Sequence, residues 1–213
     1  MIDSSFISQS AKTRIGVFNA TARLLRTEEL DSISVRQICE EAKVGRSTFY
    51  AYFTDKYAVI QWFTDVIHRA GAAEIGRTLS WEEGHRITTG AYISHIGMLN
   101  AAARSSDYNA IGPYSVRRWE ESLKETIVEY KHLALTRKLE LQIAALSTAA
   151  TAVASYCFAS QDMPLDEIVD ALISITPPDL YELLATPVFP SSESAAYERS
   201  ELALINLLSI GKL

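Results

Sequence analysis

Five side chains within residues 46–52 have the chemistry needed to contact a nucleic acid: Arg46, Ser47, Thr48, Tyr50 and Tyr52. Arginine can hydrogen-bond the acceptor edge of guanine, and threonine can meet a base edge or the methyl group of thymine. Hydroxyls, phenols and the N–H groups at the start of a helix suit phosphate and sugar oxygens. The intervening Phe49 and Phe53 predict that a helix over 46–53 buries its aromatic side and exposes these five polar side chains.

A short helix immediately before this stretch must position it. Ser34 is followed three residues later by Gln37, a capping box that starts a helix at Val35. The apolar period ends near Lys43, and Gly45 opens the next helix. Two short helices joined by a tight turn are the layout of a helix-turn-helix that reads DNA. An ordinary helical hairpin with a polar surface is the alternative. Flanking residues complete the predicted DNA-contact set: Ser34, Arg36 and Lys56.

The stretch resembles the N-terminal domain of the TetR/AcrR family of transcriptional regulators, whose pattern is T-x-x-x-I-A-x-x-A-G-V-S-x-x-T-x-Y-x-x-F-x-x-K. Two departures from the pattern affect the turn between the helices. Lys43 replaces a glycine, so it must adopt a left-handed conformation or the helix must end differently. Gly45 replaces the serine that usually caps the second helix. The matching positions keep an unbroken register: Ser34, Ile38, Ala42, Val44, Thr48, Tyr50, Phe53 and Lys56.

This resemblance implies a homodimeric one-component regulator, usually a repressor, that a small-molecule effector releases from double-stranded operator DNA. It also implies that the start of an upstream helix over 13–27 touches DNA phosphate. Lys12 and Arg14 are therefore secondary candidates for DNA contact, with a solvated helix face as the alternative.

Charge is distributed unevenly along the chain. Residues 1–60 hold eight Lys/Arg and seven Asp/Glu, a balance of +1, whereas residues 61–213 hold twelve and nineteen, a balance of −7. The two sum to the net charge of −6. Because the part predicted to bind DNA is nearly neutral, affinity should depend on a few placed phosphate contacts and on dimerisation, with a marked salt dependence.

Cysteine usage and the N-terminal sequence predict a cytoplasmic protein. Cys39 and Cys157 are the two cysteines, so no disulfide framework is expected, and residues 1–10 lack the pattern of a signal peptide. Residues 141–161 carry no charge, but glutamine, serine, threonine and alanine make them too polar to span a bilayer. No membrane association is expected.

The apolar spacing predicts an all-α fold. The expected organisation is a three-helix helix-turn-helix domain over 1–54, a larger helical bundle for effector binding and dimerisation over 55–175, and a partly helical extension over 176–213. A break is expected at 81–84. Beyond Phe53, helices are expected over 55–77, 85–104, 107–111, 113–133, 137–160, 165–175 and 195–209.

Small side chains along 137–160 would allow close approach of another helix. By the family resemblance, this helix and 165–175 form half of an intersubunit four-helix bundle, and packing within one subunit is the alternative. The small residues are Ala144, Ala145, Ser147, Ala149, Ala150, Ala152, Ala154 and Ser155.

Aromatic and polar-tipped side chains in the bundle are candidates for binding an effector, with an ordinary core as the alternative: Tyr92, His95, Met98, Tyr114, Trp119 and Tyr156. The effector would act by shifting the linker helix 55–77 and changing the separation of the two recognition helices.

Enzyme activity is not expected. The chain has no glycine-rich phosphate loop, no G-x-S-x-G and no C-x-x-C, and its histidines lack metal-ligand spacing. No cofactor or metal is expected. The alternative function is a TetR-like protein that binds DNA or docks on another regulator without ligand control. A drug-sized cavity in the bundle would favour the ligand-controlled function.

Overall fold

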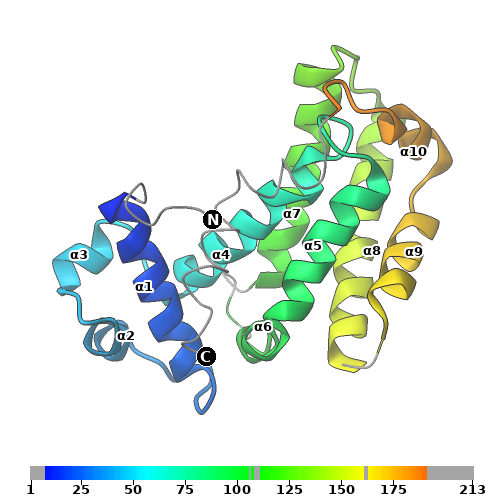
Figure 1. Ribbon diagram of the computed structural model, residues 1–213. Helices are drawn as coiled ribbons and strands as arrows, with labels where there is room; N and C mark the ends of the chain where they lie inside the picture. The colour runs from blue at the N-terminus through cyan, green and yellow to red at the C-terminus, as the bar shows by residue number, and fades with distance from the viewer. Residues whose placement is uncertain (1–7, 106, 108–110, 161–162, 191–213) are drawn as a thin grey trace.

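The computed structural model describes residues 8–105, 107, 111–160 and 163–190. These residues form helices joined by short turns (Figure 1), which confirms the all-α prediction. The helices are α1 (Gln9–Leu24), α2 (Val35–Ala42), α3 (Arg46–Tyr50), α4 (Lys56–Ala70), α5 (Trp81–Ser94), α6 (Ile96–Ala103), α7 (Ile111–Glu125), α8 (Arg137–Ser160), α9 (Leu165–Ser174) and α10 (Pro178–Ala185). A 3₁₀ turn, η2 (Ala72–Glu74), follows α4, and a π-helical turn, η3 (Thr126–Tyr130), follows α7.

Helices α1 to α3 gather at one end of the molecule and α5, α7, α8, α9 and α10 at the other, with α4 running between them (Figure 1). The small N-terminal unit is held by aromatic packing. Phe18 of α1 stacks on Phe63 of α4 with ring centroids 4.2 Å apart, and Phe49 of α3 is fully buried. Burying large apolar side chains is the main stabilising contribution to so small a unit. The core therefore joins α4 to the first three helices.

The linker helix is shorter than predicted, because α4 ends at Ala70 instead of continuing to 77. The chain turns at Gly71, where a Cβ atom would lie 2.4 Å from Thr88 Oγ1 and 2.6 Å from the backbone oxygen of Gly84. Only glycine permits this approach of the end of α4 to α5. The prediction of a break at 81–84 was wrong, since α5 begins there with a Ser80–Glu83 capping box.

The other predicted boundaries in the bundle had mixed outcomes. The expected helix 85–104 is two helices, α5 and α6, because the backbone leaves helical geometry at His95 (φ −124°, ψ 21°). The expected helix 113–133 ends earlier, at Glu125, and continues as η3. Helix α8 has the predicted bounds 137–160, and α9 ends one residue before the predicted 175.

The C-terminal extension is helical where the structure describes it. Pro178 lies in the first turn of α10. The backbone N–H that proline lacks would have no hydrogen-bond partner within the helix at this position. Leu180 and Leu184 of α10 are fully buried against the bundle core. The helix expected over 195–209 lies outside the described residues, as does most of 107–111.

Candidate nucleic-acid interface and internal cavity

Helices α2 and α3 form the predicted helix-turn-helix. Ser34 caps α2: its hydroxyl accepts a hydrogen bond from the backbone N–H of Gln37 at 3.2 Å, and the Gln37 side chain accepts one from the Ser34 N–H at 2.9 Å. Lys43 ends α2 in the left-handed conformation, with φ 56° and ψ 42°. The capping box confirms the predicted start of α2, and Lys43 adopts the first of the two alternatives expected for it. The lysine at this position therefore takes the backbone conformation that glycine would adopt without strain.

The exposed side of α3 carries the predicted contact residues. Arg46, Ser47, Tyr50 and Tyr52 are exposed and Thr48 is half-buried, while Phe49 and Phe53 face the core. None of these five polar side chains makes a hydrogen bond or ion pair with another residue of the described ranges. They are accordingly open to an outside partner.

The second helix is shorter than the predicted 46–53. The backbone N–H groups of Tyr52 and Phe53 both donate to the carbonyl oxygen of Phe49, at 3.0 Å each, so the chain tightens into a turn after Tyr50. Tyr52 therefore projects from this turn and not from the helix itself.

The flanking basic residues have different surroundings. Arg36 forms an exposed ion pair with Glu40 at 3.0 Å, an interaction weak enough to yield to a phosphate. Lys56 is engaged within the domain, since its ammonium donates to the carbonyl oxygens of Asp31 at 2.7 Å and Ile33 at 2.9 Å. Lys12 is exposed, and the guanidinium of Arg14 lies 5.7 Å from the ring centroid of Trp62.

The turn between α1 and α2 also contacts the bundle. Asp31 Oδ1 accepts a hydrogen bond from Ser105 Oγ at 2.5 Å, just past the end of α6, and another from the phenol of Tyr57 at 3.0 Å. Burial and the Asp31 carboxylate raise the pKa of Tyr57 to about 12, so this phenol stays protonated as a donor. Arg104 and Glu29 add an ion pair at 4.0 Å. This link, which we call the Asp31–Ser105 contact, joins the helix-turn-helix to α6.

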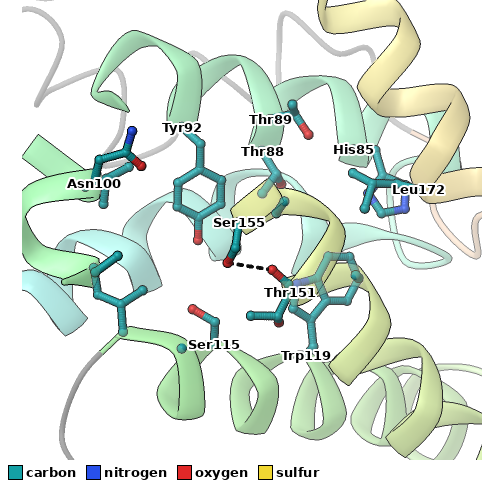
Figure 2. A pocket seen from close by; sticks show the side chains of 16 residues that line it. His85, Thr88, Thr89, Tyr92, Asn100, Ser115, Trp119, Thr151, Ser155 and Leu172 are labelled. Carbon is teal, nitrogen blue, oxygen red and sulfur yellow. Dashed lines mark hydrogen bonds between the residues drawn. The ribbon is translucent and has the colours of Figure 1, made fainter. Parts of the chain in front are cut away.

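A partly open cavity of about 200 Å³ lies between five helices of the bundle (Figure 2). Its wall is formed by His85, Thr88, Thr89 and Tyr92 of α5, Leu99, Asn100 and Ala103 of α6, Ile111, Gly112, Ser115 and Trp119 of α7, Ala150, Thr151, Ala154 and Ser155 of α8, and Leu172 of α9. A second hollow of about 500 Å³ lies between α1 and α6 and includes His95, Met98, Arg26 and Arg104.

His85 stands out among the side chains of the cavity wall. It is 2% exposed, and its Nε2 atom has no hydrogen-bond partner among the described residues. The ring is held between Trp81, with centroids 5.8 Å apart, and Trp119, at 5.4 Å. Burial lowers the pKa of His85 to about 4, so the imidazole is neutral at physiological pH.

The family model described as bacterial regulatory proteins, tetR family, matches residues 17–61, which span the second half of α1, all of α2 and α3, and the start of α4. A TetR transcriptional regulator from Streptococcus agalactiae 2603V has a similar structure, with a TM-score of 0.53 and 19% sequence identity. The match covers 79% of this chain and 96% of that one. The helix-turn-helix segment of the chain, residues 17–61, matches the TetR family.

A further solved structure shares the fold of this chain. The dihydroxyacetone kinase operon activator DhaS superimposes with a TM-score of 0.57 at 15% identity, over 84% of this chain and 98% of its own. No curated protein sequence matches the chain significantly. At these identities the structural comparisons establish the fold of the part of the chain that they cover.

The residues predicted to bind the effector are distributed over several places. Tyr92 and Trp119 line the cavity of Figure 2, whereas His95 and Met98 line the hollow between α1 and α6. Tyr114 is half-buried and lines neither space, and Tyr156 is 71% exposed on the outside of α8. Sequence reasoning missed most of the polar wall: Thr88, Thr89, Asn100, Ser115, Thr151 and Ser155.

The small residues of α8 face three ways. Ala145 and Ala152 are exposed on the outside of the molecule, Ala150 and Ser147 are buried, and Ala150, Ala154 and Ser155 line the cavity. Ala144 and Ala149 are half-buried.

In the described ranges, no cluster of three or more His, Cys, Asp or Glu side chains is placed to hold a metal ion. Nor does that part of the chain contain a helix with the length and apolar character needed to cross a bilayer.

Proposed function

We propose that this TetR-family protein is a one-component transcriptional repressor that binds operator DNA as a homodimer and is released by a small molecule. The observation that carries this proposal is the outer face of α3. Arg46, Ser47 and Tyr50 are exposed there without partners among the described residues, directly after a capped α2 in the family's register. Arginine and hydroxyl side chains on a recognition helix are suited to base edges and phosphates in the major groove.

The outer surface of α8 supports dimerisation. Five exposed residues of this helix follow one another at spacings of four, three, four and four: Leu141, Ala145, Thr148, Ala152 and Tyr156. Such spacing places them along one side of the helix, where small residues permit close packing and Leu141 and Tyr156 supply apolar area. A two-fold dimer through this face would present two α3 helices to half-sites roughly 34–36 Å apart on DNA.

The cavity supports ligand control over the alternative of a ligand-independent DNA-binding or docking protein. A bundle without an effector would be expected to fill its core to the density of other protein interiors. This bundle instead leaves a pocket between its helices, bordered by hydroxyls, a phenol and an imidazole. The space is smaller than the drug-sized cavity expected from the sequence, since drug-binding pockets measure roughly 300–1,000 Å³, so an effector that fits it should be a small metabolite.

Coupling between cavity and DNA should pass through α6. The cavity takes no wall residue from α4, the helix expected to carry the signal, whereas Leu99, Asn100 and Ala103 of α6 border it. The same helix leads directly into Ser105, which bonds Asp31 in the turn before α2. A ligand that moves α6 therefore acts on the helix-turn-helix through the Asp31–Ser105 contact. The proposed mechanism therefore has two states, and the Asp31–Ser105 contact connects the cavity to the helix-turn-helix.

Loss of the Arg46 guanidinium should weaken operator binding about tenfold to a hundredfold, because an arginine–guanine pair contributes about 1–3 kcal/mol of discrimination. Fluorescence anisotropy with DNA fragments from upstream of the protein's own gene would measure wild type and Arg46→Ala at two salt concentrations. Arg137→Ala removes an exposed arginine at the start of α8 and is the matched control. Equal weakening by both variants, or no DNA binding by the folded wild type, would contradict the assignment of α3.

The Asp31–Ser105 contact can be tested without knowing the effector. In Ser105→Ala, amide hydrogen exchange in the turn over 25–34 should become about tenfold faster, because a hydrogen bond to a charged carboxylate is lost. Ser94→Ala is the control, since the Ser94 hydroxyl bonds only its own helix, at Gly90 O. Unchanged exchange in the turn would show that Ser105 does not restrain it, and α6 would then need another route to the DNA-binding helices.

A further inference from the structure

The cavity between α5 and α9 has an uncharged wall. Among the described residues that line it, none is Asp, Glu, Lys or Arg. Transfer of an ion from water into such a space is very costly unless an opposite charge or a metal meets it. The two titratable groups of the wall do not supply one, because burial keeps His85 neutral and raises the pKa of the Tyr92 phenol. The wall therefore disfavours carboxylates, phosphates and ammonium compounds.

His85 supplies an anchor for a ligand. The structure contains two fully buried histidines, and their surroundings differ. His68 Nε2 lies 2.7 Å from Ser122 Oγ, and its ring also bonds the backbone of Arg118, so its polar atoms are used within the protein. His85 Nε2 has no such partner, and the His85 side chain borders the cavity. A buried polar atom left without a hydrogen bond is unfavourable, and a ligand hydroxyl at Nε2 would remove that deficit.

Helix α8 provides hydrogen-bond acceptors. Thr151 donates its hydroxyl hydrogen to Ser147 O at 2.9 Å, and Ser155 donates its own to Thr151 O at 2.9 Å. The dashed line in Figure 2 marks the second bond. Because each hydroxyl hydrogen is already used, the oxygen atoms of these two side chains offer lone pairs to the cavity. A ligand group that faces Thr151 and Ser155 must therefore donate hydrogen bonds.

The other wall residues are mostly apolar, and the cavity is small. Leu99, Ile111, Trp119 and Leu172 surround the polar positions, so a ligand must also carry hydrocarbon surface. The cavity volume of about 200 Å³ limits the ligand to a compound smaller than most drugs. An all-polar sugar would leave polar groups against these side chains, and a long acyl chain would not fit.

We infer that the effector is a small uncharged alcohol or phenol with one apolar side, whose hydroxyl bonds His85 Nε2. The inference rests on the proposed function, because it names the chemical class of ligand for the same cavity. It makes no use of DNA binding and can therefore be tested separately.

Three probes of one shape and different charge test the inference: benzyl alcohol, benzoate and protonated benzylamine, with cyclohexanol as a second neutral alcohol. Isothermal titration calorimetry on the full chain at pH 7.5, without DNA, should show binding of at least one alcohol and at least tenfold weaker binding of both ions. His85→Phe keeps an aromatic ring between the two tryptophans and removes Nε2. It should weaken binding of the alcohol about tenfold or more.

His95→Phe is the matched control, because His95 lines the other hollow, between α1 and α6. It should leave alcohol binding unchanged. If His85→Phe does not fold, as judged by circular dichroism, the isosteric Thr151→Val provides the same test by removing an acceptor from the wall. Absence of alcohol binding, equal binding of benzoate, or full affinity in the folded cavity variant would each overturn the inference. Loss of operator binding in the experiment on Arg46 would leave it untouched.

Discussion

The free energy of unfolding is expected to be about 4 kcal/mol lower at pH 5 than at pH 7.5, because two buried histidines accept protons only after the chain unfolds. Burial, together with the positive charges of Arg118 and Arg77, lowers the pKa of His68 to about 3. Burial alone lowers the pKa of His85 to about 4. Both values lie below the ordinary histidine value of 6.5. A difference of this size is a large share of the stability of most domains.

The sign follows from proton counts in the two states. Above pH 6.5 both histidines are neutral whether the protein is folded or unfolded, so they add no pH dependence. Between pH 6.5 and 4 the unfolded chain binds two protons that the folded chain excludes, and stability falls as the pH falls. The loss levels off as the pH passes through the folded-state values near 4 and 3.

Urea denaturation from pH 4.5 to 8 would measure this dependence, and His85→Phe would assign it. The variant lacks the His85 proton, while His68 and the partly buried His95, whose pKa burial also lowers, still contribute, so the slope between pH 5 and 6 should be shallower than that of the wild type but not zero. A slope that is the same in the variant would mean that carboxylates, not buried histidines, cause the acid sensitivity.

The DNA-binding half of the candidate site could be predicted from the sequence because local rules determine it. A capping box at Ser34, a turn at Lys43 and the buried Phe49 fix which side of α3 faces outward, and none of these depends on distant residues. Lys56 shows the limit of that reasoning. Its ammonium meets carbonyl oxygens of the turn before α2, which lie more than twenty positions away in the chain.

The cavity could not be predicted in the same way, because five helices converge on it. Thr151 and Ser155 resemble ordinary small helix residues until their positions opposite His85 are known. One local signal was available and missed: Ser80 and Glu83 repeat the capping pattern of Ser34 and Gln37, and they place His85 in the first turns of α5. The close approach at Gly71, which ends α4, is a tertiary contact that sequence periodicity does not report.

Replacing Arg77 by Met is expected to lower the free energy of unfolding by about 3 kcal/mol, since a buried guanidinium with several partners is lost. Arg77 is 6% exposed and donates to Thr126 Oγ1 at 2.8 Å, Ser122 O at 3.0 Å and Glu125 Oε2 at 2.8 Å. Its guanidinium carbon also lies 4.4 Å from the ring centroid of Tyr130. Arg77 thus connects the turn after η2 to the C-terminal end of α7. Its positive charge is also favourable there, because the C-terminal end of a helix dipole is negative.

Glu125→Gln separates the buried hydrogen bonds from the ion pair. The Glu125 side chain is 52% exposed, so water can replace its partner and the change should cost less than about 1 kcal/mol. Arg77→Lys keeps the charge but loses the fork of donors, and it should fall between the other two variants. Thermal and urea unfolding of all three would rank them. Equal losses in Arg77→Met and Glu125→Gln would mean that the ion pair, and not the bonds to Thr126 and Ser122, holds α7 against the turn. The cavity wall at Ser115 and Trp119, on the same helix, would then depend on a surface charge that salt can screen.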